Sequence, residues 1–125
     1  SDVYNSRTYC LFEDIEKIKK NGLAKGGSLE NAVVVNDKEI LNPEGLRNEK
    51  EFVNHKILDL AGDFLLSGYK ILGAVYCYQG GHQLSNLFLH KLLKSTSNYK
   101  IIELDAKLVK ENKLLTSNFK LAANA

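Results

Sequence analysis

The sequence predicts an α+β fold: a two-layer sandwich in which helices pack on one face of a mixed sheet. The chain has 125 residues, about one domain's worth. Hydrophobic residues make up 44% and charged residues 26%, which is ordinary for a globular domain and argues against wholesale disorder. Segments with helical and strand-like hydrophobic spacing alternate along the chain. We therefore expect a single domain over residues 1–125, with a loosely held tail over about 116–125.

A small β-α-β-type insert is expected near the N-terminus, over about residues 8–42. Apolar residues recur at i, i+4 and i+7 over 11–20, acidic side chains precede basic ones, and Asn21 begins a helix stop. This pattern predicts a short amphipathic helix. The β-branched run 32–35 predicts a strand, and a turn separates it from a second short strand over 39–41.

The longer elements lie in the second half of the chain. Residues 49–66 form the longest helical pattern, which ends at a Ser-Gly pair. The apolar run 71–78 has the length and composition of a buried strand. After two glycines we expect a second helix over 82–94, and then a last strand over 101–104.

Charge, hydropathy and cysteine usage narrow the class of protein. The net charge of +2 is too small and too evenly spread to predict a nucleic-acid partner. Polar residues interrupt the longest uncharged stretch, 71–89, so no transmembrane segment is expected. Cys10 and Cys77 lie far apart and outside any C-x-x-C pair, which fits a reducing, cytoplasmic compartment. No secretory signal is visible and the chain has no Met, so we expect that it begins after processing or is a piece of a longer protein.

One side of the long helix carries a stripe of polar side chains. His55, Asp59 and Asp63 lie each four residues from the next, on the same side of the helix. Phe52 and Leu66 lie among them, and such residues are unusual on a side that only meets water. We therefore expect this side to face another protein surface or a cavity. The opposite side, expected to pack on the sheet, is formed by Val53, Ile57, Leu60, Ala61 and Phe64.

The polar stripe contains candidate metal ligands and a candidate catalytic pair. His55 and Asp59 can converge on one ion that suits zinc or ferrous iron, and the alternative is a solvated pair on the helix surface. His82 follows Gly80-Gly81 at a strand-to-helix turn, where the backbone can approach a ligand closely. A helix N-terminus disfavours an imidazolium, so a carboxylate partner is needed, and Asp63 is the candidate. The alternative is that His82 is a polar capping residue.

The polar residues belong to a longer pattern, H-K-x-L-D-x-x-G-D at residues 55–63, followed by Gly-His at 81–82. Further matching segments are 6–8, 23–28, 31–35 and 51–54. Together they resemble the C-terminal half of the UDP-3-O-acyl-N-acetylglucosamine deacetylases, over about residues 6–95. This family comprises metal-dependent enzymes at the committed step of lipid A synthesis in Gram-negative bacteria.

The resemblance implies a role for each residue that matches the family's motifs. It implies that His55 and Asp59 are ligands of a zinc ion, with ferrous iron as the other metal that suits them. It implies that His82 is the catalytic histidine and that Asp63 orients it. Thr8 matches the threonine whose hydroxyl contacts the oxyanion.

The resemblance also implies contacts with the substrate. Lys56 matches a substrate-binding lysine, and Tyr9 stands where family members often have Phe, which keeps a stacking surface. The helix 12–20 and the strand 32–35 resemble the insert that forms an apolar passage for the acyl chain, although plain core packing explains the same pattern. Gln79 stands where the family often has a basic residue, so contacts to the nucleotide diphosphate are expected to differ.

Two groups of the family's active site have no counterpart in this sequence. A third zinc-binding histidine and the glutamate general base belong, in the family, to an N-terminal domain. We therefore expect this chain to be the C-terminal half of a deacetylase of a UDP-sugar acyl substrate, with that domain as its partner and no useful activity alone. The alternatives are a standalone, non-catalytic module that binds a nucleotide sugar or an acyl chain, and an α+β domain whose polar stripe is incidental.

Overall fold

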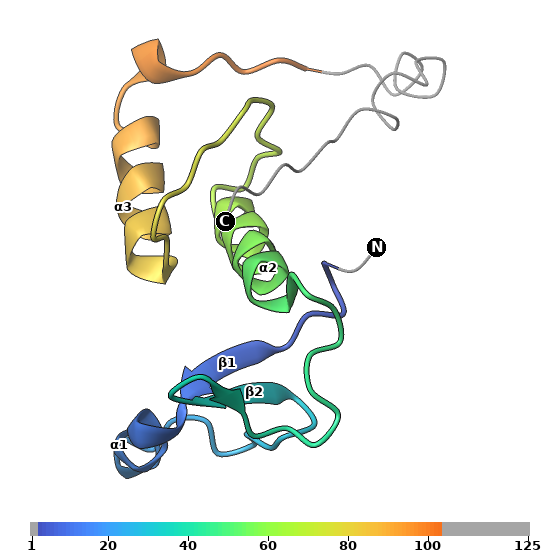
Figure 1. The fold of residues 1–125 in the computed structure, drawn as a ribbon. Helices are drawn as coiled ribbons and strands as arrows, with labels where there is room; N and C mark the ends of the chain where they lie inside the picture. Colours follow the sequence, from blue (N-terminus) through green and yellow to red (C-terminus); the bar gives the residue numbers. More distant parts are fainter. Residues whose placement is uncertain (1–2, 104–125) are drawn as a thin grey trace.

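The computed structural model of the chain describes residues 3–103 (Figure 1). The elements are, in order, β1 (Thr8–Leu11), a 3-10 turn η1 (Phe12–Asp14), α1 (Ile15–Lys20), β2 (Ala32–Asn36), β3 (Glu39–Ile40), α2 (Glu51–Leu65), α3 (His82–Leu93) and a second 3-10 turn η2 (Thr96–Asn98). Among the helices of this described range, none combines the length and the apolar character needed to cross a membrane.

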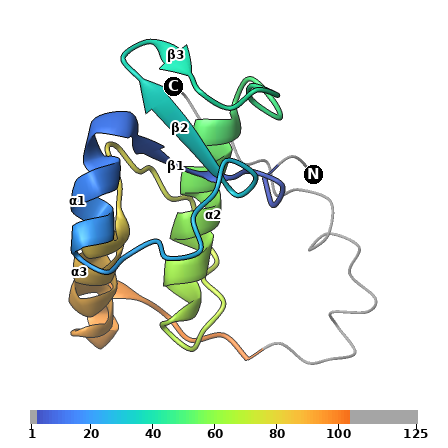
Figure 2. The same ribbon diagram turned by 90° about the horizontal axis from the view of Figure 1, so that it is seen from below.

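The three strands form one mixed sheet in the order β1-β2-β3 (Figure 2). β1 and β2 run parallel with Tyr9 opposite Val33, and α1 lies in the connection between them. β2 and β3 form an antiparallel hairpin with Asn36 opposite Glu39. The α+β class and the β-α-β-type unit are thus confirmed. Sequence spacing alone does not reveal β1, because four residues are too few to show the alternation of apolar and polar side chains that is typical of a strand.

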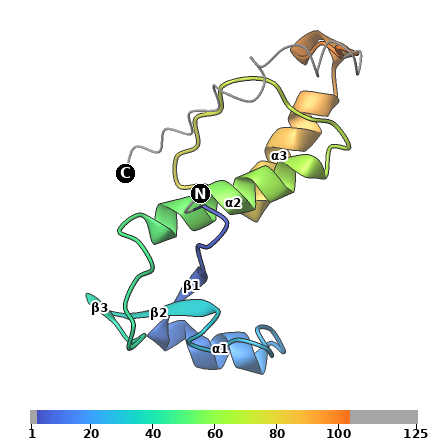
Figure 3. The same ribbon diagram turned by 90° about the vertical axis from the view of Figure 1, so that its right-hand side faces the viewer.

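The sheet and α2 meet at a charged contact. Val33 and Val34 on β2 are buried apolar side chains, but Glu51, the first residue of α2, is also completely buried. It pairs with Arg7, which directly precedes β1. In Figures 1 and 3, α2 lies on one side of the small sheet and α1 on the other.

The helix α3 packs against α2, and the rings of Phe64 and Phe88 are stacked with centroids 5.5 Å apart. We expected the helices to pack on one face of the mixed sheet, with the apolar side of α2 against it. That arrangement is not formed in residues 3–103, since Phe64 faces α3 and the sheet contains only short strands from the N-terminal part.

The strands expected over 71–78 and 101–104 are not formed in the described residues. Residues 71–78 run without helix or strand, and Tyr76 is 97% exposed instead of buried. A strand requires hydrogen bonds to a neighbouring strand, and the sheet of residues 3–103 ends at β1 and β3. Residues 101–103 have no regular structure, while residue 104 and the tail expected at 116–125 lie outside the described part.

Candidate functional site

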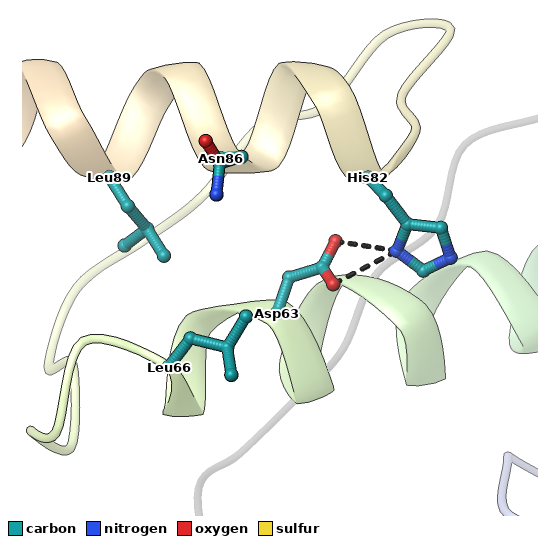
Figure 4. A pocket seen from close by; sticks show the side chains of 5 residues that line it. All are labelled: Asp63, Leu66, His82, Asn86 and Leu89. Carbon is teal, nitrogen blue, oxygen red and sulfur yellow. Dashed lines mark hydrogen bonds and ion pairs between the residues drawn. The ribbon is translucent and has the colours of Figure 1, made fainter.

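The clearest polar contact of the site joins α2 to α3. His82 is the first residue of α3, and its Nδ1 lies 2.9 Å and 3.0 Å from the two carboxylate oxygens of Asp63 (Figure 4). A carboxylate only accepts hydrogen bonds, so Nδ1 carries a hydrogen. The Nε2 atom points away from Asp63 in Figure 4, and the His82 side chain is 70% exposed. The structure thus brings these two residues into the contact that the sequence suggested and leaves Nε2 accessible.

Local backbone geometry explains how His82 comes to lie beside Asp63. Gly81 is extended and precedes the first turn of α3, while Gln79 has a φ of 49°, in the left-handed region. This sharp turn brings the start of α3 beside the last turns of α2. A pocket of about 100 Å³ lies between the two helices and is lined by Asp63, Leu66, His82, Asn86 and Leu89.

A second cluster of polar contacts on α2 is centred on His55, which lies one helical turn before Asp59. The His55 Nδ1 lies 3.3 Å from the backbone oxygen of Ser6, and its Nε2 lies 3.3 Å from Oδ1 of Asp59. A carbonyl oxygen only accepts, so Nδ1 carries the hydrogen of this contact. Nε2 then faces a second pure acceptor, and this arrangement is favourable only with a proton or a cation between them.

The separation of these two atoms fits a metal ion. Neighbouring ligands of a tetrahedral zinc ion, with bonds of roughly 2.0–2.1 Å, lie about 3.3 Å apart. The other oxygen of Asp59 accepts from Nζ of Lys56 at 3.0 Å, which leaves Oδ1 for an ion. Within residues 3–103, however, no cluster of three His, Cys, Asp or Glu residues is close enough to hold a metal. Nε2 of His55 and Oδ1 of Asp59 are therefore two donor atoms at a spacing that a metal ion would accept.

The residues to which the family resemblance gives a role in substrate binding lie beside this pair. The ring of Tyr9 on β1 meets Phe52 edge to face, with centroids 4.9 Å apart, and lies 6.2 Å from the His55 ring. Nζ of Lys56 lies 5.3 Å from the centre of the Tyr9 ring, close enough for a cation–π contact. Thr8, the first residue of β1, is exposed next to Tyr9. The site thus combines the start of β1, one side of α2 and the start of α3.

Sequence reasoning assigned no role to Arg7 and Glu51. The hydrogen bonds from the Arg7 guanidinium lower the pKa of the Glu51 carboxyl to about 2, against the opposing effect of burial. The same pairing raises the pKa of Arg7. Both residues stand in the segments that carry the family resemblance. Their separation of 44 positions hides the contact from any local pattern.

Comparison with known proteins identifies the family of this arrangement. A family model described as UDP-3-O-acyl N-acetylglycosamine deacetylase matches residues 1–94. The chain belongs to this deacetylase family. The match contains β1, all of α2 and all of α3, so it covers every residue discussed above for the site.

Curated relatives within the deacetylase family are similar over most of this chain. UDP-3-O-acyl-N-acetylglucosamine deacetylase of Campylobacter fetus subsp. fetus (strain 82-40) is 45% identical over 89% of this chain and 38% of its own length. The proteins of that name from a Psychrobacter species and a Nitratiruptor species are each 45% identical, over 81% and 82% of this chain and 34% of their own length. The chain therefore spans about a third of the length of the curated relatives it matches.

Proposed function

We propose that this chain is the C-terminal part of a metal-dependent amide hydrolase that removes the acetyl group from UDP-3-O-acyl-N-acetylglucosamine in lipid A biosynthesis. The observation that carries the proposal is the pairing of polar groups along α2. Two pairs follow one another along α2: His55 with Asp59 and, one turn later, Asp63 with His82 of the neighbouring helix α3. A binding module has no need of both pairs together. Family membership and the printed names of the relatives support the substrate class.

His55 and Asp59 would hold the metal, through Nε2 and Oδ1. Zinc is the ion whose ligand spacing agrees with the 3.3 Å between these atoms, and ferrous iron suits the same donors. When bound, such an ion supplies Lewis acidity and makes a water nucleophilic near neutral pH. Nζ of Lys56 donates to the second oxygen of Asp59, and this contact would leave Oδ1 as the oxygen available to an ion.

His82 would act on the substrate through its exposed Nε2. In its protonated form it donates to the developing oxyanion of the acetamide and then passes a proton to the leaving amine. Asp63 fixes the hydrogen on Nδ1, orients the ring and stabilises the imidazolium. The hydroxyl of Thr8 donates to the same oxyanion, while Lys56 and the ring of Tyr9 bind the UDP-sugar portion.

An N-terminal domain would complete the site with a third histidine ligand and a glutamate base. The described part of the chain supplies two ligands and has a large exposed apolar area that such a domain would cover. Leu65 and Leu66 at the end of α2 are about two-thirds or more exposed, and residues 71–78 form an apolar run without a neighbouring strand. We expect this run to join a sheet when the domain is present. Cys10 and Cys77 are free thiols, which agrees with a cytoplasmic location.

Complementation tests the proposal. The isolated chain is mixed with the N-terminal domain of the deacetylase, and acetate release from UDP-3-O-acyl-N-acetylglucosamine is measured. We expect no useful activity from either part alone and activity from the mixture. Strong activity of the isolated chain, or binding of a nucleotide sugar with no acetate release from the mixture, contradicts the proposal and favours the binding module.

A further inference from the structure

The contact between Arg7 and Glu51 is unusually complete for an ion pair. Oε1 of Glu51 accepts from the backbone nitrogen of Arg7 at 3.0 Å and from its Nε at 2.9 Å. Oε2 accepts from Nη2 of Arg7 at 3.1 Å and from the backbone nitrogen of Arg47 at 2.6 Å. The remaining Arg7 donors reach Glu44 and the backbone oxygens of Leu29 and Gly45. The two side chains are thus completely desolvated, and all their described polar atoms are paired.

The position of this pair relates it to the site. Arg7 stands between Ser6, whose carbonyl oxygen contacts His55, and Thr8, the first residue of β1. Glu51 lies one helical turn before His55 on α2. The ion pair therefore fixes the start of β1 to the first turn of α2, where the contact between Ser6 and His55 is made.

We propose that Arg7 and Glu51 are positioning residues of the deacetylase site: they hold the Ser6 carbonyl oxygen against Nδ1 of His55, so that Nε2 is the ring nitrogen that faces Asp59 and is left to bind a cation there. This inference rests on the proposed function, because it concerns the histidine taken as a metal ligand. The same contact fixes Thr8 and the Tyr9 ring beside α2.

The chemistry of a histidine ligand explains why the contact between Ser6 and His55 matters for metal binding. A metal binds the ring nitrogen that lacks a hydrogen, and a carbonyl acceptor on the other nitrogen sets both the tautomer and the ring orientation. Loss of such an outer partner typically lowers metal affinity about 10- to 100-fold. The planar guanidinium of Arg7 meets both oxygens of Glu51, a geometry that the single ammonium of a lysine does not reproduce.

The test measures zinc affinity in the full-length deacetylase that contains this chain. Zinc-free protein is titrated with Zn²⁺ against a competing chelator, and the tautomer of His55 is read from its ring ¹⁵N shifts. For Arg7→Lys, which keeps the charge, we expect about a 10-fold or greater loss of affinity and a mixture of tautomers. The double variant Arg7→Met/Glu51→Leu removes both buried charges together and leaves only the exposed Glu44 without its partner, so it keeps the test possible if the lysine variant does not fold. We expect the same loss there.

Two further variants separate the possible outcomes. Asn42 is a buried residue that pairs with the backbone of Val34, Leu29 and Ala32, so Asn42→Ala lowers stability without removing the Arg7–Glu51 pair or the contact between Ser6 and His55. It is expected to leave zinc affinity unchanged, and an equal loss in Asn42→Ala would overturn the inference. The inference is also overturned if folded Arg7→Lys or the double variant keeps wild-type zinc affinity and a single His55 tautomer. If His55→Ala itself leaves zinc affinity intact, the proposed function fails instead.

Discussion

The buried carboxylate of Glu51 makes stability depend on pH in a range that can be worked out from the structure. Its pKa is lowered from 4.5 to about 2. Because the folded-state pKa is the lower one, the stabilisation is fully present above about pH 4.5 and is lost as the pH falls toward 2. A difference of roughly 2.5 pH units, at about 1.4 kcal/mol per unit, corresponds to roughly 3 kcal/mol. Glu51→Gln removes the charge at every pH and is nearly isosteric with the protonated acid.

The assay is urea unfolding of wild-type and Glu51→Gln protein, followed by circular dichroism between pH 7 and pH 2. We expect the wild type to exceed the variant by roughly 3 kcal/mol or more at pH 7, and this difference to shrink by roughly 3 kcal/mol as the pH reaches 2. Glu44→Gln is the matched control, because Glu44 also pairs with Arg7 but is exposed, so its loss costs under about 1 kcal/mol. Equal losses for the two variants, or a difference that does not change with pH, would refute the reasoning.

Variants at three further residues test contacts of the site in the full-length protein. Asp63→Asn is expected to lower kcat for acetate release by about 10²- to 10⁴-fold with unchanged metal content, because His82 loses the charge that stabilises its imidazolium; a kcat within about threefold of wild type contradicts this. Tyr9→Leu removes the ring that meets Phe52 and is expected to raise KM about 3- to 10-fold, whereas Tyr9→Phe keeps the wild-type value. Phe88→Ala removes the stacked ring between α2 and α3, and thermal unfolding is expected to report a loss of about 1–2 kcal/mol; no loss would mean that the stacking contributes nothing.

The parts of the site that lie on one helix could be predicted from the sequence. The spacing of four residues between His55, Asp59 and Asp63 places them on one side of α2, as the structure confirms. The position of His82 at a helix N-terminus likewise predicted a carboxylate partner, and Asp63 contacts it in the structure. Their roles as metal ligands and catalytic groups stay predictions.

Features that depend on distant segments could not be read from local patterns. The run 71–78 has the composition of a buried strand, yet in residues 3–103 no strand lies beside it, and composition does not say where the neighbour comes from. The pair of Arg7 and Glu51 joins two segments 44 positions apart, and either residue alone resembles an ordinary surface charge in the sequence. Folding turns them into a buried pair beside the site.

Metal analysis of the full-length protein tests the central claim, that His55 and Asp59 hold a metal ion. Zinc and iron per protein are measured for the wild type, His55→Ala, Asp59→Ala and His90→Ala, where His90 is an exposed histidine in the last turn of α3 and serves as the matched control. The account predicts about one metal ion in the wild type and in His90→Ala, and a loss of most of it in the other two variants. Full metal content in both His55→Ala and Asp59→Ala would contradict it.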